Sequence, residues 1–263
     1  MNIVVCIKQV PENADVKINQ ETNTLIREGI PGIINPFDTY AMEEALRLKE
    51  KMTGKVTAIS MGPPQAEAAL REAVSLGVDD GILISDRAVA GSDTLATSYI
   101  LAQGLKKYGQ FDLIICGKQA MDGDTAQVGP GIAETLGIPH IAYVRKIEEI
   151  KPEAKYLRVE RMLEEGYEVV ETSLPALITV VKEINEPRLP SFKGMLRAKK
   201  EEIIRWTASD LKLDEKRIGL DGSPTLVIKI FTPEARTDGE IIEGTPEEQV
   251  EKLAEKLKET KMV

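Results

Sequence analysis

The chain has 263 residues, of which 42% are hydrophobic and 29% charged, a composition typical of an ordinary soluble globular protein. This length predicts one large domain with an appendage. The 34 basic and 43 acidic residues give a net charge of −9, which argues against a general nucleic-acid binder.

The cysteine and histidine content limits the kinds of metal, disulfide and catalytic sites that the chain can form. Cys6 and Cys116 each lie in an apolar, strand-like run, so we interpret them as reduced core thiols and not as a disulfide or metal pair. His140 is the only histidine, which excludes a multi-histidine metal site and argues against a Ser/His/Asp triad. No apolar run approaches the roughly 18 residues of a membrane span, and the N-terminus reads as a strand instead of a signal peptide. We expect a cytoplasmic protein without membrane insertion.

The first half of the chain alternates strand and helix patterns. Residues 3–7 form a buried-type strand, which Pro11 stops, and residues 16–27 alternate as an exposed β-hairpin does. Asn35-Pro-Phe-Asp38 predicts a helix that runs through residue 51, with Asp38 as its N-cap.

The same pattern then recurs three times. Strands are predicted at 56–61, 81–85 and 111–116, and helices at 66–76, 95–108 and 126–136. Four successive strand-then-helix units predict an α/β fold with a doubly wound parallel sheet. Ligands of such sheets bind beyond the carboxyl ends of the strands, so the ends near Cys6, Met61 and Gly117 are expected to face one crevice.

The stretch 117–131, GKQAMDGDTAQVGPG, joins the last of these strands to its helix. A glycine-bearing turn between a strand and a helix start is a common phosphate seat, because free N–H groups and the helix dipole converge there. The same residues also fit an ordinary turn with Asp124 or Thr125 as N-cap. The pattern alone leaves both interpretations open.

After Pro139 the pattern changes to strands at 141–147, 156–162, 167–171 and 176–181, which we expect to be antiparallel additions to the sheet edge. Residues 185–200 mix basic and apolar side chains, as a docking surface or a solvated connector does, and the residues alone favour the connector. From about residue 211 the chain reads as an arm, with a turn at 221–224 and a short strand at 226–231. A final helix begins with the capping box Thr245 to Glu248, and its apolar stripe must be buried on its own domain or on a partner.

Several motifs of catalysis are missing from the sequence. It has no P-loop, no complete Gly-x-Gly-x-x-Gly fingerprint, no Gly-x-Ser-x-Gly elbow and no His-Glu-x-x-His motif. We therefore identify no catalytic side chain, and binding is better supported than catalysis.

Residues 159–179, VERMLEEGYEVVETSLPALIT, resemble the signature of the β subunit of electron-transfer flavoprotein, and the resemblance extends over essentially the whole chain. It implies a Rossmann-like, adenine-nucleotide-binding domain at 1–184, a partner recognition loop at 185–207, and an arm at 208–263 that packs on an α subunit. In that loop, Phe192 is the implied apolar anchor on a dehydrogenase partner, together with Leu196 and Arg197. The implied cofactor-binding residues are Cys6, Asn35, Pro36, Phe37, Asp38, Met61, Gly117, Lys118, Gln119, Ala120, Met121, Asp122, Gly123, Asp124, Thr125, Ala126, Gln127 and Val128.

The family that the chain resembles has two branches. In one branch the β subunit holds AMP. In the other it holds an FAD that takes a hydride from NADH and sends one electron to ferredoxin or flavodoxin and one to the α-subunit FAD, which serves an acyl-CoA-type dehydrogenase. The segment 122–130 and the start at residues 8–11 resemble the FAD-holding, electron-bifurcating, anaerobe-type branch. The alternative outside this family is a stand-alone α/β protein that binds or hydrolyses an adenine nucleotide.

Overall fold

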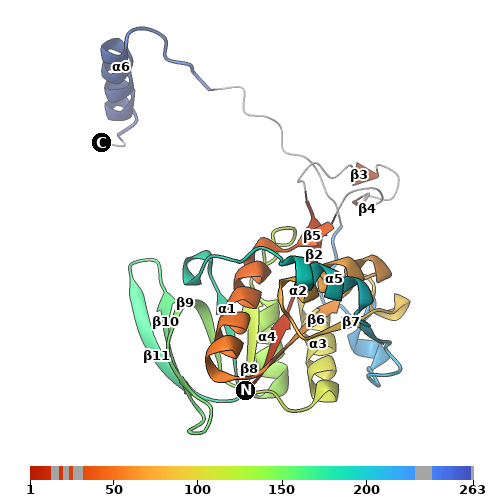
Figure 1. Ribbon diagram of the computed structural model, residues 1–263. Coiled ribbons are helices and arrows are strands. Elements are labelled where there is room, and N and C mark those ends of the chain that lie inside the picture. Colours follow the sequence, from red (N-terminus) through yellow and green to blue (C-terminus); the bar gives the residue numbers. More distant parts are fainter. Residues whose placement is uncertain (13–17, 20–23, 26–31, 229–238, 262–263) are drawn as a thin grey trace. The chain divides into compact units, whose positions relative to one another are not determined.

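The computed structural model describes residues 1–12, 18–19, 24–25, 32–228 and 239–261. The chain divides into two units, Met1–Ile228 and Lys229–Val263. The first unit is a large, mostly parallel sheet with helices on both faces (Figure 1). Its helices are α1 (Pro36–Met52), α2 (Glu67–Leu76), α3 (Thr94–Tyr108), α4 (Val128–Leu136) and α5 (Phe192–Lys200).

The central sheet has nine strands in the order β11-β10-β9-β12-β8-β1-β6-β7-β13. They are β1 (Asn2–Cys6), β6 (Lys55–Met61), β7 (Asp80–Ile84), β8 (Leu113–Gly117), β9 (His140–Lys151), β10 (Tyr156–Met162), β11 (Tyr167–Ser173), β12 (Ala176–Val180) and β13 (Ile204–Trp206). A small antiparallel pair joins β2 (Gln9–Pro11) to β5 (Gly32–Ile34), and a second pair joins β3 (Ile18–Asn19) to β4 (Thr24–Leu25).

The predicted doubly wound fold is confirmed, because β1, β6, β7 and β8 are parallel and each precedes one of the first four helices. From β1 the chain proceeds outward through β6 and β7, and it then returns to place β8 on the other side of β1. The strand order therefore reverses between β1 and β8. In an open α/β sheet this switch point is where ligands bind.

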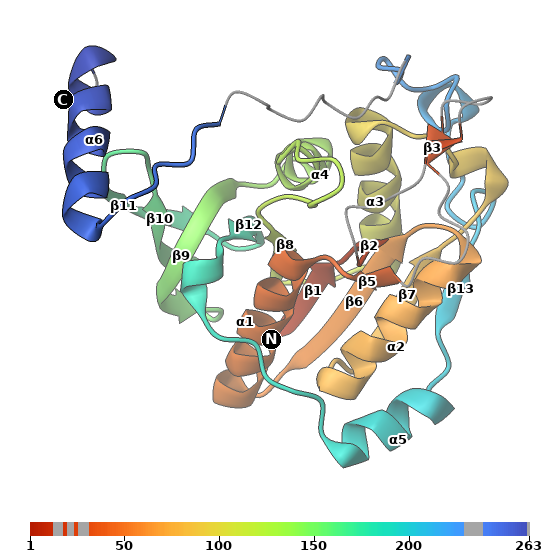
Figure 2. The ribbon, with the colours of Figure 1, turned by 90° about the horizontal axis from the view of Figure 1, so that it is seen from above.

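Two apolar layers enclose the sheet. Helices α1 and α2 pack on one face, around Met42, Leu46 and Leu70, and helices α3 and α4 cover the opposite face, around Leu105 and Ile132. The view from above shows these two pairs on opposite sides of the strands (Figure 2). Burial on both faces explains why the parallel strands read as continuous runs of branched apolar residues.

The prediction that residues 176–181 add an antiparallel edge strand is wrong. Strand β12 lies inside the sheet and is parallel to both β8 and β9. All five residues of β12 are buried, which is the signature of a central strand. The antiparallel extension consists of β9, β10 and β11.

The segment 185–200 is not all loop, because residues 192–200 form helix α5. The hydroxyl of Ser191 accepts the N–H of Gly194 at 3.0 Å and caps the helix. Arg71 of α2 donates to the Ala198 carbonyl oxygen at 2.7 Å, so α5 is tied to α2. The sequence pattern does not show the helical period here, because the helix has only nine residues and its last four, 197–200, are basic or small.

Two other predicted elements lie partly outside the described residues. The hairpin expected at 16–27 agrees with the antiparallel pairing of Ile18 with Leu25, and its other residues lie largely outside the described part. The strand expected at 226–231 is not formed in its described part, residues 226–228, and the remainder lies outside the described residues.

The second unit contains helix α6 (Pro246–Glu259), whose predicted start is confirmed. The Thr245 hydroxyl accepts the Glu248 N–H, the Glu248 carboxylate accepts the Thr245 N–H at 2.9 Å, and Pro246 occupies the first turn. Val250 and Leu253 are exposed. None of the helices in the described residues has the length and apolar character that crossing a bilayer requires.

Candidate functional site

The strand ends at the switch point form the floor of the candidate site. Cys6 ends β1 and lies in register with Cys116, the penultimate residue of β8. Met61 ends β6 beside them. The loops that follow these strands, residues 7–11 and 118–127, therefore emerge at the same edge of the sheet, as the sequence predicted. We call this edge, with the loop 118–127 and the first turns of α1 and α4, the crevice.

Asn35 is the residue that joins the two sides of the crevice. It is only 1% exposed and occupies the N-cap position of α1, although its side chain caps nothing. The side-chain NH₂ group instead donates to the Gln119 carbonyl oxygen at 2.8 Å, and the side-chain oxygen Oδ1 accepts the Met121 N–H at 3.0 Å. Asn35 therefore fixes the loop after β8 from a distance of more than 80 positions along the chain.

Asp38 is not the N-cap of α1, contrary to the sequence prediction. The helix begins at Pro36, and Asp38 lies in its first turn, 6% exposed. Its carboxylate accepts the N–H of Lys8 at 2.8 Å and that of Gly117 at 3.2 Å. A Cβ at Gly117 would collide with this carboxylate and with the Phe37 backbone, so the approach requires glycine. Burial raises the pKa of Asp38 to about 7, although the hydrogen bonds from Asn35, Lys8 and Gly117 act to lower it.

The helix after the loop begins later than predicted. Its first residue is Val128, not Ala126, and neither Asp124 nor Thr125 is its N-cap. The cause lies in the backbone, since Asp124 and Ala126 have φ values of 50° and 55°, which an α-helix does not contain. The Asp124 side chain accepts a hydrogen bond from Gln119 within the same loop.

The late helix start leaves a row of backbone N–H groups open. None of the N–H groups of Thr125, Ala126, Gln127, Val128 and Gly129 has an acceptor among the residues that the structure describes. The left-handed Ala126 is followed by Gln127 at φ −99°, ψ −23°, and such alternation produces a concave, anion-binding turn. The positive end of the α4 dipole points to the same place.

The open N–H groups fit a phosphate-bearing nucleotide. Gly123 lies in the same loop, and a Cβ built on it would meet no atom of the described residues within 4 Å. The protein itself therefore does not require glycine at this position, whereas a ligand that approached the backbone would. The donor set suits the phosphates of either AMP or FAD, and it offers no side chain with an evident catalytic role.

Charged side chains complete the crevice. The Lys8 ammonium lies 2.5 Å from the Asp122 carboxylate and ties the loop after β1 to the loop after β8. Lys118 directly follows β8, and its N–H donates to the Val180 carbonyl oxygen at 2.9 Å. Lys8 is not among the predicted site residues, although its place at a strand end of the switch point could have indicated it.

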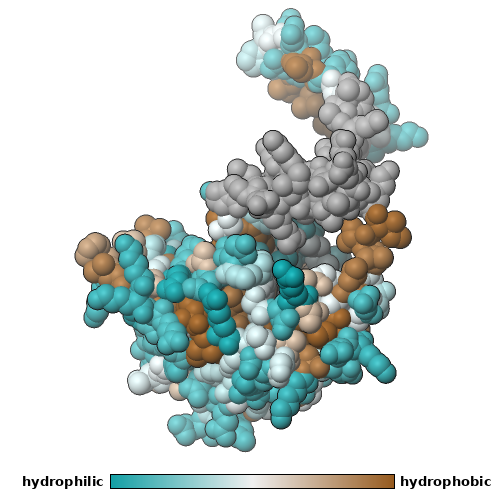
Figure 3. All heavy atoms as spheres, turned by 90° about the vertical axis from the view of Figure 1, so that its right-hand side faces the viewer, coloured by the Kyte–Doolittle hydropathy of each residue, from teal (hydrophilic) through white to brown (hydrophobic). Residues whose placement is uncertain are grey.

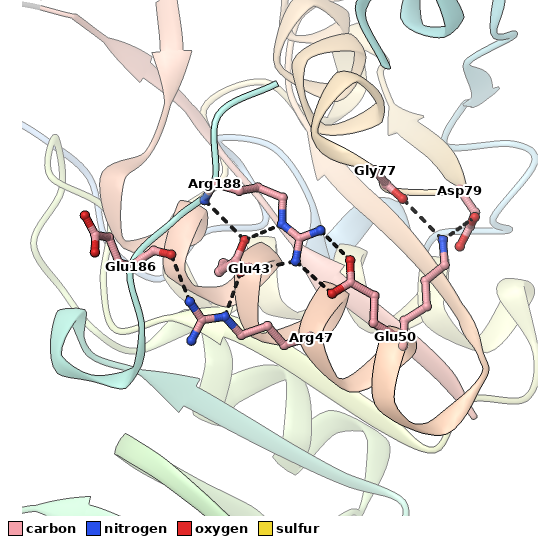
Figure 4. A network of polar contacts seen from close by, with 8 residues as sticks. Glu43, Arg47, Glu50, Gly77, Asp79, Glu186 and Arg188 are labelled. Atoms are coloured by element: carbon pink, nitrogen blue, oxygen red, sulfur yellow. Dashed lines mark hydrogen bonds and ion pairs between the residues drawn. The ribbon is translucent and has the colours of Figure 1, made fainter. Parts of the chain in front are cut away.

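A different set of contacts anchors the segment that leads to α5. Arg188 lies between two carboxylates of α1 (Figure 4), with 2.7 Å to Glu43 and 2.5 Å to Glu50. Arg47 donates to the same Glu43 at 2.7 Å and to the Glu186 carbonyl oxygen at 3.1 Å. We call Glu43, Arg47, Glu50 and Arg188 the clamp. No local pattern indicates the contacts of Arg188, because it lies about 140 positions from Glu43 and Glu50 in the chain.

The three residues predicted to dock a partner have different environments. Phe192 is 74% exposed and Leu196 is about half exposed. The Arg197 guanidinium instead donates to the carbonyl oxygens of Val78 at 2.8 Å and Asp79 at 2.5 Å, so it holds α5 in place. Apolar atoms are visible at several places on the face that the right-hand side of Figure 1 presents (Figure 3). Docking through this segment stays a prediction.

Comparison with known proteins gives the family. Residues 22–211 match the family described as "Electron transfer flavoprotein domain". The chain is 53% identical over 258 residues to the electron transfer flavoprotein subunit beta of Thermoanaerobacterium thermosaccharolyticum, and 98% of each chain is covered. It is also 47% identical, over the full length of both chains, to the caffeyl-CoA reductase-Etf complex subunit CarD of Acetobacterium woodii. It is 49% identical to protein FixA of Azotobacter vinelandii, with 93% of this chain and 89% of FixA covered. These matches show that the chain belongs to the electron transfer flavoprotein β subunit family.

Proposed function

We propose that this chain is the β subunit of an αβ electron transfer flavoprotein and holds an FAD in the crevice. In this proposal NADH reduces that flavin, and the two electrons leave for different acceptors. One goes to ferredoxin or flavodoxin, and the other goes to a flavin of the α subunit that serves a dehydrogenase of the acyl-CoA type.

The row of open N–H groups from Thr125 to Gly129 is the observation that carries the nucleotide part of this proposal. Five donors at the positive end of a helix suit a pyrophosphate better than a neutral ligand. The electron-bifurcating part rests on relatedness, since one relative bears the name of a caffeyl-CoA reductase-Etf complex subunit.

Each group of crevice residues has a distinct role in this proposal. The N–H groups bind the phosphates, Asn35 and Lys8 hold the loop in the shape that presents them, and Gly123 lets the ligand approach the backbone. Bound FAD would supply the redox chemistry, while the protein supplies position and electrostatics. Asp38 repels a phosphate less than an ordinary carboxylate would, because a carboxyl with a pKa of about 7 is still partly protonated at neutral pH.

The exposed apolar segments suit the protein partners of the proposal. Val250 and Leu253 form a stripe on α6, and residues 226–228 expose Leu-Val-Ile in the first unit. These segments would bury their side chains against the α subunit. Phe192, Leu196 and the 88% exposed Leu189 would contact the dehydrogenase.

Denaturing the purified αβ heterodimer and identifying the released nucleotides tests the cofactor. Two FAD per heterodimer are expected. One FAD and one AMP would instead identify the branch of the family whose β subunit holds AMP. A colourless chain that is stable alone and hydrolyses ATP would contradict the whole proposal.

Substitution of Gly123 tests where the phosphates lie. Gly123→Glu should expel FAD from the β subunit, since it fills the approach to the backbone and adds a like charge. Gly123→Ala is the matched control for folding, because its Cβ would meet no atom within 4 Å in the part of the chain that the structure describes. Full flavin content in the Glu variant, measured by absorbance after denaturation, would show that the phosphates bind elsewhere.

A further inference from the structure

Tyr143 has a backbone conformation that its side chain disfavours. It lies inside strand β9 with φ 61°, in the left-handed region, which is rare for a bulky aromatic residue. Between the pairs Ile178–Ile141 and Val180–Val144, β9 has two residues where β12 has one. Tyr143 therefore belongs to a β-bulge, a feature that commonly redirects a side chain next to a functional site.

Two contacts connect this bulge to the crevice. The Tyr143 N–H donates to the buried Thr179 hydroxyl at 3.1 Å, and Thr179 also contacts the first turn of α4. A Cβ built on Gly129 would lie 2.6 Å from the Thr179 methyl carbon, so the first turn of α4 packs directly on it. Thr179 therefore links Tyr143 to the first turn of α4, where the open N–H groups lie.

The Tyr143 ring also holds a cation. The Lys118 ammonium lies over the ring, 5.3 Å from its centroid, which is within the range of a cation–π contact. Lys118 forms no ion pair with a carboxylate of the described residues, whereas the neighbouring Lys8 is neutralised by Asp122. The Lys118 charge is therefore held at the rim of the crevice without a counter-ion from the described chain.

We propose that Tyr143 is a positioning residue, which holds the Lys118 ammonium at the rim of the crevice so that Lys118 pairs with a phosphate of the bound nucleotide. The inference rests on the proposed nucleotide binding and adds to it a residue outside the loop 118–127. Strained backbone conformations persist where the surrounding structure enforces them, and here the Thr179 hydroxyl and the Lys118 charge both act on the same residue.

Three substitutions of Tyr143 separate the ring from the backbone strain. Tyr143→Phe keeps the ring, Tyr143→Leu removes the ring and keeps the strain, and Tyr143→Gly removes both. Lys118→Met removes the charge. AMP binding to the flavin-stripped αβ heterodimer is measured by calorimetry at low and high salt, and melting temperatures are recorded for every variant.

The Phe variant should bind AMP as the wild type does. The Leu, Gly and Lys118→Met variants should bind about tenfold more weakly and with a smaller salt dependence, because a charge-assisted contact to phosphate is lost. The double variant Tyr143→Leu with Lys118→Met should bind no more weakly than Lys118→Met alone. Tyr143→Gly should melt above Tyr143→Leu, since glycine adopts a positive φ without strain.

Wild-type binding by Tyr143→Leu, or independent, additive losses in the double variant, would overturn the role of Tyr143 and leave the proposed function standing. A wild-type heterodimer that carries no FAD and binds no AMP would overturn the proposed function and this inference together.

Discussion

Asp38 and Glu43 are buried carboxylates on the same helix, α1, yet their pKa values are shifted in opposite directions. Burial raises the pKa of Asp38 to about 7. Burial also acts to raise the pKa of Glu43, but hydrogen bonds from Arg188 and Arg47 outweigh it and hold that pKa below its usual value. Both side chains have little surface exposed, 6% and 4%, but Asp38 lies deeper in the protein and loses more of its solvation than Glu43.

The difference between the two pKa values comes from this depth and from the partners of each carboxylate. Asp38 accepts backbone N–H groups, which carry only partial charges, whereas Glu43 meets two full guanidinium charges. The crevice can therefore neutralise its buried carboxyl near an anionic ligand, while the clamp keeps a permanent ion pair that anchors the chain before α5. The first turn of α1 lies at the crevice, and its middle holds a segment that exposes apolar side chains.

The largest expected effect is on the pH dependence of stability. Between its unfolded pKa near 3.8 and its folded pKa of about 7, folded Asp38 retains a proton that the unfolded chain has lost, so the unfolding free energy falls as pH rises. At about 1.4 kcal/mol per pKa unit, the stability of the wild type relative to Asp38→Asn should fall by about 3 kcal/mol between pH 5 and pH 8. Urea unfolding at both pH values measures this. If the unfolding free energies of the wild type and Asp38→Asn changed with pH in the same way, the raised pKa of Asp38 would be contradicted.

Breaking the clamp should lower the unfolding free energy by somewhat less. Arg188→Met leaves the buried Glu43 with Arg47 as its remaining cation, and we expect a loss of about 2–3 kcal/mol at pH 7. Because the folded pKa of Glu43 is lowered, the wild type has the stability of this ion pair in full above pH ~4.5 and loses it as pH falls through the folded pKa. The difference between the wild type and Arg188→Met should therefore shrink at low pH. Arg47→Met is the matched control and should cost less, since Arg188 also binds Glu50. Equal stability of Arg188→Met and wild type at pH 7 would contradict the clamp.

Asn35→Ala should weaken nucleotide binding about tenfold and cost about 2 kcal/mol, because it leaves two backbone groups of the crevice loop without their partner. Asn185→Ala offers a control that leaves the loop 118–127 untouched, because the Asn185 amide donates instead to the Tyr40 carbonyl oxygen of α1 at 3.0 Å. The control should lose stability and keep its AMP affinity in calorimetry. Loss of affinity in both variants would mean that the loop responds to general destabilisation alone.

The smallest effect on stability is expected at Phe192. Its side chain is largely exposed, so Phe192→Ala should change the unfolding free energy by less than about 0.5 kcal/mol. It should slow electron delivery to the dehydrogenase and leave NADH oxidation by an artificial acceptor intact. Val169→Ala, an exposed apolar substitution on β11, should change neither rate. An unchanged rate of electron delivery by the Phe192 variant would mean that the helix anchored by the clamp does not dock the dehydrogenase through Phe192.

The sequence predicted the first four strand-and-helix units because each carries local signals. The strands are short apolar runs, and Asp93, which precedes α3, caps that helix by accepting the Ala96 N–H at 3.0 Å. Gly77 ends α2 at φ 125°, a conformation that glycine favours. The sequence could not place β12, because a strand's neighbours depend on the whole sheet, and it missed β13, whose three residues are too few to show a period.

The amino-acid sequence by itself determined the fold class, the loop at the switch point and the family, since periodicity, caps and the signature at 159–179 are local properties of the chain. Only the tertiary structure decided which atoms of that loop stay open. Ala126 takes a left-handed conformation, Asn35 reaches Gln119, and Asp38 turns from a predicted cap into a buried acceptor for Gly117, 79 positions away. Hydrogen bonds over such separations depend on how the strands assemble, and no local pattern records them.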